Sequence, residues 1–179
     1  SSVEASSITE PMIDFFASSL KCCRHLHVPL QSGDDGILKA MRRPYTRAQY
    51  ADLIETLADR IPGIGIGGDV MVGFPGETEA AFQNTCDLIA KHPMVYLHVF
   101  PYSPRQKTPA ARMEGQVDPR VKKRRGAELR ALGERKAGAF QRAFLGGTLE
   151  VLFENRRESE TGYLQGVSDN YIRVFAPGS

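Results

Sequence analysis

The chain has 179 residues, 41% of them apolar and 25% charged, and its 23 Lys and Arg against 21 Asp and Glu give a net charge of +2. This composition is ordinary for one globular domain, or for one domain with a small appendage, and the overall charge selects no class of partner. We expect neither a membrane span nor a secretory signal, and the cysteines Cys22, Cys23 and Cys86 fit no disulfide framework and no zinc or iron–sulfur motif. A reducing, cytoplasmic compartment is the expectation.

The first third of the chain begins with strand and helix patterns. Residues 1–4 could close a strand, and Thr9 can cap a helix over about 10–20. A strand over about 24–30 follows, and its side chains alternate between two faces. Its apolar face carries Leu26, Val28 and Leu30, and its polar face carries His25, His27, Pro29 and Gln31.

Helices and strands then alternate. Thr46 and Gln49 have the spacing of a capping box, which predicts the start of a helix. The periodicity predicts helices over 37–41, 46–61 and 79–91 and strands over 64–72 and 95–100. In the last strand Val95, Leu97 and Val99 face one way, and Tyr96, His98 and Phe100 face the other.

The end of the second predicted strand is the most informative turn. Val70 and Val72 point to one face, and Asp69 and Met71 point to the other. The Gly-Phe-Pro-Gly sequence at 73–76 then turns the backbone tightly towards a helix. Because ligands of parallel α/β folds lie at the carboxyl ends of strands, Asp69 is a candidate ligand contact. The alternative is a strand-to-helix turn that binds nothing.

This order of elements predicts an α/β fold with parallel strands and right-handed crossovers, as in a barrel or a doubly wound sheet. Three or four strands are too few to close a barrel, and natural domains avoid open strand edges. We therefore expect a partial parallel (β/α) barrel, the C-terminal half of a larger one. A dimer or a swapped assembly could cover its open edges.

The composition changes in the last third. A long helix is expected over about 119–145, and between Arg120 and Lys136 it carries eight Lys or Arg against two Glu. Three alternating strands then predict the start of a small antiparallel β module. The strands are expected at 148–154, 161–167 and 171–175. The predicted domains are 1–145, the partial barrel, and 146–179, a truncated β module.

Two polar groups could bind ligands. The histidines of the polar strand faces, His25, His27 and His98, could coordinate zinc. More often such histidines are hydrogen-bonded inside a barrel, and the partners that would orient metal ligands are not evident from the sequence. At strand ends, Arg43 could hold a carboxylate and Asp69 an ammonium group, with Gln31 beside them. A loop salt bridge is the alternative.

The basic helix and the β module suggest nucleic acid. The basic run could follow phosphates, although charged helix faces are usually only solvated. The β module favours RNA, because small β modules often bind single strands. The candidate RNA contacts are Lys122, Lys123, Arg124, Arg125, Arg156, Arg157, Tyr171 and Arg173.

Several stretches in consistent order resemble one family, the radical S-adenosylmethionine methylthiotransferases. They are residues 25–33, 41–46, 69–78, 100–105 and 108–111. The sequences Leu-His-Val-Pro-Leu-Gln-Ser-Gly at 26–33 and His-Val-Phe-Pro-Tyr-Ser-Pro-Arg at 98–105 most resemble the branch that acts on threonylcarbamoyladenosine in tRNA. The last residues, from 146, resemble the beginning of a TRAM domain, the RNA-binding module of this family.

The resemblance implies a partial barrel whose 4Fe-4S cluster, on a Cys-x-x-x-Cys-x-x-Cys loop, reductively cleaves S-adenosylmethionine. A second 4Fe-4S cluster would supply sulfur. The implied product is a methylthio group at C2 of N6-threonylcarbamoyladenosine, next to the anticodon of tRNA, and the clusters need a reductant. Because the cluster cysteines are not in this sequence, the resemblance implies an inactive C-terminal fragment that binds no cluster.

The resemblance also implies contacts to S-adenosylmethionine. Glu4 would meet the ribose or the amino-acid end, and Gln31 and Arg43 would reach the ribose and the carboxylate. Asp69 would meet the ribose hydroxyls, and the backbone at Ser103 would meet the adenine. No catalytic residue and no metal ligand is identified in this chain.

Three alternatives stay open. One is a sister branch, which modifies isopentenyladenosine in tRNA or a ribosomal protein. Another is a non-catalytic RNA-binding or scaffold protein, suggested by the basic run and the missing cluster cysteines. The third is a hydrolytic or aldolase-type barrel that uses the three histidines and would purify with stoichiometric zinc.

Overall fold

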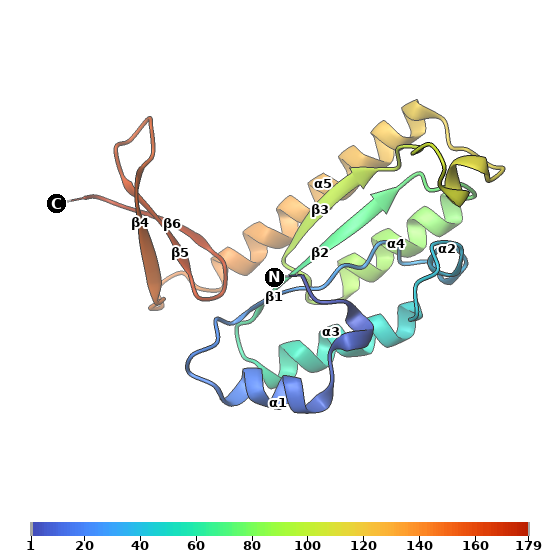
Figure 1. Cartoon of the computed structure of the whole chain (residues 1–179). Coiled ribbons are helices and arrows are strands. Elements are labelled where there is room, and N and C mark those ends of the chain that lie inside the picture. Colours follow the sequence, from blue (N-terminus) through green and yellow to red (C-terminus); the bar gives the residue numbers. More distant parts are fainter. Residues whose placement is uncertain (1, 179) are drawn as a thin grey trace.

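The chain folds into a helix-covered parallel sheet, a long helix and a separate antiparallel sheet, as the computed structural model of residues 2–178 shows (Figure 1). The parallel sheet has the order β1-β2-β3, and the antiparallel sheet has the order β4-β5-β6. This confirms the predicted fold class, a partial parallel α/β sheet followed by a small antiparallel module. Ser1, the first residue of the predicted barrel domain, and Ser179, the last residue of the predicted β module, lie outside the described residues.

The elements follow one another in the predicted order. The strands are β1 (His25–His27), β2 (Gly65–Val72), β3 (Tyr96–Pro101), β4 (Val151–Arg157), β5 (Leu164–Ser168) and β6 (Arg173–Ala176). The helices are α1 (Glu10–Ser18), α2 (Asp35–Ala40), α3 (Arg47–Arg60), α4 (Glu79–Lys91) and α5 (Pro119–Arg142), with short 3-10 helices η1 (Ala5–Ser7) and η2 (Pro109–Arg112). Within residues 2–178, no helix is both long and apolar enough to cross a membrane.

Local signals explain where the helices begin. Thr46 accepts a hydrogen bond from the Gln49 N–H, and the Gln49 side chain accepts one from the Thr46 N–H, so the predicted capping box opens α3. Thr78 and Asp118 cap α4 and α5 through their side-chain oxygens. α5 ends at Arg142, earlier than predicted.

Two of the predicted strands are shorter than expected. The strand expected over 24–30 is regular only as β1, although the Val28 and Leu30 N–H groups still donate to the Gly67 and Asp69 carbonyl oxygens of β2. Just beyond it, Gln31 has a φ of 65° and leaves the extended conformation. β6 begins after the expected residue 171, because Tyr171 has a φ of 71° in the preceding turn. β4 and β5 also begin later than predicted.

The amino-terminal segment extends the free edge of β1. Ser2 forms a parallel bridge with His27, and the Val3 N–H donates to the His27 carbonyl oxygen at 2.9 Å. The strand-like character expected for residues 1–4 is therefore present at Ser2 and Val3.

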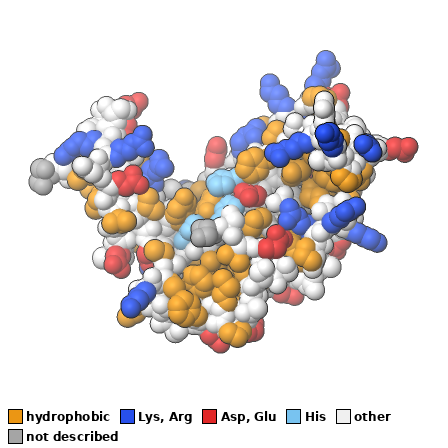
Figure 2. All heavy atoms as spheres, viewed as in Figure 1, with side chains coloured by type: hydrophobic (Ala, Val, Ile, Leu, Met, Phe, Trp, Pro, Cys, Tyr) orange, Lys and Arg blue, Asp and Glu red, His pale blue; other side chains and the backbone are white. Residues whose placement is uncertain are grey.

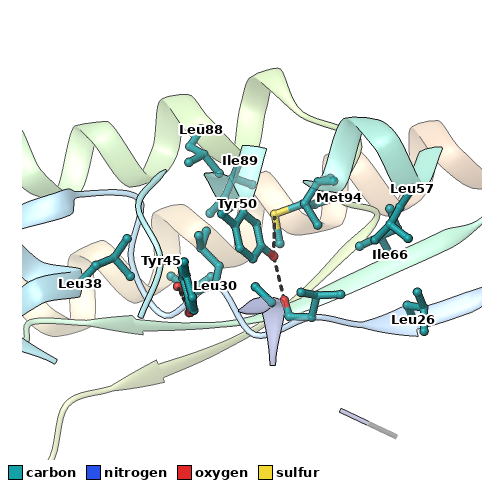
Figure 3. Packing of buried hydrophobic residues seen from close by; sticks show 14 of the residues in the cluster. Leu26, Leu30, Leu38, Tyr45, Tyr50, Leu57, Ile66, Leu88, Ile89 and Met94 are labelled. Carbon is teal, nitrogen blue, oxygen red and sulfur yellow. Dashed lines mark hydrogen bonds between the residues drawn. The ribbon is translucent and has the colours of Figure 1, made fainter. Parts of the chain in front are cut away.

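The hydrophobic core lies between the parallel sheet and its helices (Figure 3). Val70 and Val72 of β2 are fully buried in it, as their alternation predicted, and so is Ile66 of the same strand. Tyr50 of α3 lies in the same core, and its hydroxyl donates to the Val28 carbonyl oxygen at 2.7 Å, which satisfies the buried phenol. The opposite face of the sheet carries the polar side chains of all three strands.

The turn between β5 and β6 docks the antiparallel sheet against the amino-terminal end of the parallel sheet. Asp169 pairs with Arg24, with 2.6 Å between Nε and Oδ2, and Asn170 donates to the Gly63 carbonyl oxygen at 3.2 Å. Asn170 is 1% exposed, and its carbonyl oxygen approaches Gly65 so closely that a Cβ atom would collide with it. The docked arrangement therefore needs glycine at position 65.

Candidate functional site

A pocket of about 300 Å³ lies at the carboxyl end of the parallel sheet. We call it the strand-end pocket, and its lining includes Gln31, Met41, Arg43, Met71, Phe74 and Met113. Its walls are mostly apolar, with a few polar groups, as in many small-molecule sites. The structure therefore brings Gln31 and Arg43 together at the edge where strand-end ligands bind.

The backbone of Gln31 is held in an unusual conformation beside Asp69. The Gln31 N–H donates to the Asp69 carbonyl oxygen at 2.8 Å, and its own carbonyl oxygen accepts from the Met71 N–H at 2.9 Å. A positive φ is costly for a residue other than glycine, so these two bonds maintain a strained position. They fix Gln31 next to the strand that carries Asp69.

Arg43 of the strand-end pocket also contacts Glu4. The two side chains form an ion pair with 3.1 Å between Nη1 and Oε2, and both are partly exposed. The Arg43 Nε is buried without a hydrogen-bond partner among the described residues. A buried donor without a partner is unusual and can be offered to a ligand. Ser103 is exposed and lines neither this pocket nor the one described next.

The polar face of the parallel sheet forms a second hollow of about 380 Å³. We call the side chains of His25, His27, Asp69, Tyr96 and His98 on this face the inner face. Figure 2 shows the histidines gathered in the hollow between the antiparallel sheet and the rest of the molecule. The predicted alternation of β1, β2 and β3 is therefore confirmed for these residues.

Asp69 and Tyr96 connect the imidazoles of the inner face. Asp69 Oδ1 lies 3.0 Å from His27 Nε2 and 3.3 Å from His98 Nδ1. The Tyr96 hydroxyl lies 2.8 Å from His25 Nε2 and 3.2 Å from His27 Nδ1. The four contacts form one continuous network in the order His98, Asp69, His27, Tyr96 and His25.

Burial controls the protonation of two members of this network. It lowers the pKa of His25 to about 4, and it raises the pKa of Tyr96 to about 12. At neutral pH, His25 is therefore uncharged and Tyr96 keeps its proton. The tyrosine hydroxyl can then donate to one imidazole and accept from the other.

Tyr96 was not among the predicted site residues, yet it is central to the inner face. Its ring lies over Gly67, the residue paired with it in β2, where a Cβ atom would collide with the ring. A glycine opposite an aromatic residue on the adjacent strand was the available signal, but it appears only once the register is known.

The prediction of Arg125 as an RNA contact is wrong. Arg125 is 3% exposed, and its Nη1 lies 2.7 Å from Oε2 of Glu77, which is 5% exposed. Glu77 also accepts from the Gly73 N–H at 2.7 Å. The pair therefore fastens the turn after β2 to α5, and the guanidinium is enclosed by protein.

The other predicted RNA contacts differ in their surroundings. Lys122 donates to the Tyr102 carbonyl oxygen, Arg124 pairs with Glu79, and Arg157 donates to the Gly162 carbonyl oxygen. Tyr171 is 56% exposed but stacks on His25, with ring centroids 4.1 Å apart. All seven predicted contacts other than Arg125 stay candidates, and Lys123, Arg156 and Arg173 are exposed.

The cysteines do not fit an iron–sulfur cluster. Cys86 is buried, Cys23 is exposed and Cys22 is intermediate. Among residues 2–178, the one group of three potential metal ligands is His27, Asp69 and His98, and it contains no thiolate.

Comparisons with known proteins define the class. The family model described as the radical SAM superfamily matches residues 2–89. The solved structure of coproporphyrinogen III oxidase (HemN) from Escherichia coli shares the fold with a TM-score of 0.63 at 17% identity, covering 75% of this chain and 31% of that chain. An Elp3 from Methanocaldococcus infernus gives 0.56 at 12% identity, covering 98% and 52%. The fold is that of the radical SAM superfamily.

Curated relatives narrow this to one family. The chain is 43% identical, over its full length, to the threonylcarbamoyladenosine tRNA methylthiotransferase MtaB of Bacillus subtilis (strain 168). It is 40% identical, over 89% of its length, to the tRNA-2-methylthio-N(6)-dimethylallyladenosine synthase of Alkaliphilus oremlandii (strain OhILAs). The chain spans 40% and 34% of these relatives' lengths. It belongs to the radical SAM methylthiotransferase family, as its motifs predicted.

Proposed function

We propose that this chain supplies part of a tRNA methylthiotransferase that adds a methylthio group at C2 of N6-threonylcarbamoyladenosine next to the anticodon. Residues 1–145 would be the C-terminal part of its barrel, and residues 146–179 would begin its TRAM-like module. The observation that carries the proposal is that Gln31 and Arg43 line one pocket at the carboxyl end of a parallel sheet, with the Gln31 backbone bonded to that of Asp69 in β2. The relatives' names support tRNA as the substrate.

The strand-end pocket suits the amino-acid part of S-adenosylmethionine. Arg43 has a guanidinium for the carboxylate, and Glu4, held beside it, has a carboxylate for the ammonium group. The side chain of Gln31 and Oδ2 of Asp69, the carboxylate oxygen that contacts neither histidine, could form hydrogen bonds with the ribose hydroxyls. The apolar lining would exclude water from the bound cofactor. When bound, S-adenosylmethionine would supply radical chemistry at an iron–sulfur cluster.

The proposal places both 4Fe-4S clusters outside this chain, because the cysteines present do not fit one. The chain alone is then expected to be inactive, and the complete enzyme would need a reductant. The anticodon loop of tRNA would contact the exposed arginines of the β module. The backbone near Ser103 would face the adenine of S-adenosylmethionine. The enzyme would act in the cytoplasm, and neighbouring elements or a second copy would cover the free strand edges.

Cofactor binding can be tested on this chain directly. Equilibrium dialysis with S-adenosylmethionine should show weak binding that Arg43→Ala reduces by about tenfold, the usual effect of losing a charge-assisted bond. Arg47→Ala is the matched control, because Arg47, partly exposed at the start of α3, does not line the strand-end pocket. Equal binding by the two variants would count against the assigned site.

The activity is tested on the longer protein that contains this sequence. After anaerobic reconstitution with iron and sulfide, it should bind clusters, cleave S-adenosylmethionine and produce 2-methylthio-threonylcarbamoyladenosine in tRNA, measured by nucleoside mass spectrometry. Failure to bind a cluster or to cleave S-adenosylmethionine would end the proposal. Methylthiolation of isopentenyladenosine would assign the sister branch, whose members are 38–40% identical to this chain.

A non-catalytic RNA-binding role is the second candidate, and the exposed Lys123, Arg156 and Arg173 favour it. A gel shift with a tRNA anticodon stem-loop distinguishes the two. Salt-sensitive binding that persists after Gln31→Ala and Asp69→Asn, in a protein that cleaves no S-adenosylmethionine, would support the second role.

A further inference from the structure

The proposed function gives no role to the histidines of the inner face, and it uses only one oxygen of Asp69 beside them. His27 and His98 both direct a ring nitrogen at the same oxygen, Oδ1 of Asp69. The three ligand atoms lie within 4.8 Å of one another. We propose that His27, Asp69 and His98 bind one divalent transition-metal ion, for which Zn²⁺ is the probe.

The distances suit the first coordination shell of zinc. Zn²⁺ binds imidazole nitrogen and carboxylate oxygen at about 2.0–2.1 Å, so two ligands of a tetrahedral site lie about 3.3 Å apart. The observed separations from Asp69 Oδ1 are 3.0 Å to His27 and 3.3 Å to His98. Two neutral imidazoles and one carboxylate also suit the borderline divalent metals rather than Ca²⁺ or Mg²⁺.

Tyr96 supplies the orienting partner that the sequence did not reveal. Its hydroxyl lies 3.2 Å from His27 Nδ1 and so fixes Nε2, the other ring nitrogen, towards Asp69. The hydroxyl has one proton. If that proton goes to His25, at the shorter distance of 2.8 Å, His27 must donate from Nδ1. The His27 Nε2 lone pair then faces a carboxylate oxygen, and a cation between them removes the repulsion.

The surroundings allow a metal to enter and leave a position for another ligand. The His27 side chain is 9% exposed, Asp69 is 26% exposed and His98 is 57% exposed, so the site opens to solvent on the His98 side. Three protein ligands leave a fourth position for water or for a substrate atom. Both contacts use Asp69 Oδ1, and Oδ2 stays available to a nucleoside. The metal proposal does not rest on the proposed function.

Zinc titration of this chain, with calorimetry and Co²⁺ absorption spectra, tests the proposal. The background carries Cys22→Ser and Cys23→Ser, because free thiols also bind zinc. The expected result is one Zn²⁺ per chain, with tetrahedral Co²⁺ bands. Both should be lost in Asp69→Asn and in His98→Ala, and Tyr96→Phe should weaken binding about tenfold.

His25→Ala is the matched control, because His25 lies on the same face and contacts Tyr96 but not Asp69. It should bind zinc with the parent's stoichiometry. No binding in the parent chain, or zinc retained by either Asp69→Asn or His98→Ala, overturns the proposal. Circular dichroism checks that each variant is folded. His98 is the most exposed of the three ligands, so His98→Ala can still test the proposal if Asp69→Asn fails to fold. Dialysis with S-adenosylmethionine reports separately on the proposed function.

Discussion

The two sheets of this molecule are stabilised in different ways. The parallel sheet packs one face against helices, and Ile54, Leu57 and Ile66 in that core have no exposed surface. Neither hydrophobic cluster of the described residues includes a residue of β4, β5 or β6. In the antiparallel sheet Leu152 is 80% exposed and Phe175 is 45% exposed.

This difference shows what each region depends on. The parallel sheet has its own core and should keep its structure when the module is disturbed. The antiparallel sheet buries little apolar surface, and three strands without a covered face are close to the minimum for stability. Its order should therefore depend on the polar turn around Asp169 and Asn170, which contacts the parallel sheet. The following changes test this contrast.

Arg125→Ala should have the largest effect. It leaves the buried Glu77 carboxylate without its ion-pair partner, which should lower the free energy of unfolding by about 3–5 kcal/mol in urea titrations. Arg124→Ala, one position earlier on the exposed side of α5, should leave the midpoint unchanged. A small loss in Arg125→Ala would show that Glu77 finds water or another partner.

The pH dependence of Arg125→Ala gives a further test. Burial raises the pKa of Glu77, while Gly73 and Arg125 act in the opposite direction. Without Arg125, the pKa of Glu77 in the folded state rises further above its value in the unfolded state. The variant then keeps its stability below the unfolded-state pKa and loses it as the pH rises through the folded-state pKa. The deficit relative to the parent should therefore be larger at about pH 8 than at about pH 5. A deficit independent of pH would assign the loss to packing.

One leucine-to-alanine change in each sheet's region compares the two directly. Leu57→Ala removes a fully buried side chain from α3 and should cost about 2–5 kcal/mol. Leu152→Ala in β4 makes the same chemical change at an exposed position and should stay within about 0.5 kcal/mol. Thermal unfolding of both variants checks this. Similar costs would show that β4 packs against something in solution.

The local parts of the fold were predictable because their signals lie close together in the sequence. The capping box of Thr46 and Gln49 and the alternation around Asp69 each need only a few residues. The exact extent of β1 was not predictable, because the left-handed conformation of Gln31 depends on its neighbours in β2.

The candidate site was predictable where it depends on strand ends and not where it depends on distant partners. Gln31 and Arg43 were placed by the order of the elements, and they line one pocket. The burial of Arg125 was missed, because its partner Glu77 is 48 positions away and a basic run looks exposed. The role of Tyr96 was missed for the same reason, since it depends on the register of β2 and β3.

Asp169→Ala should release the antiparallel sheet without affecting the parallel one. The bidentate contact with Arg24 is partly exposed, so its loss should cost about 1 kcal/mol, or about fivefold faster amide exchange in β5 and β6. Exchange in β2 should not change. Arg24→Ala should have the same effect, and the double variant should add little to it. Faster exchange in both sheets would contradict the contrast between them.

The last test concerns His25, where the two sheets meet. Its imidazole stacks on Tyr171, and burial lowers its pKa to about 4. Because the folded state favours the neutral ring, this contribution to stability is present above the unfolded value of about 6.5 and is lost as pH falls towards 4. NMR titration of the ring protons should give a midpoint near the folded value, and Tyr171→Ala should shift it upwards. A midpoint near 6.5 in the parent would show that the turn between β5 and β6 does not cover His25. In that case, mild acid would leave the rate of amide exchange in β5 and β6 unchanged.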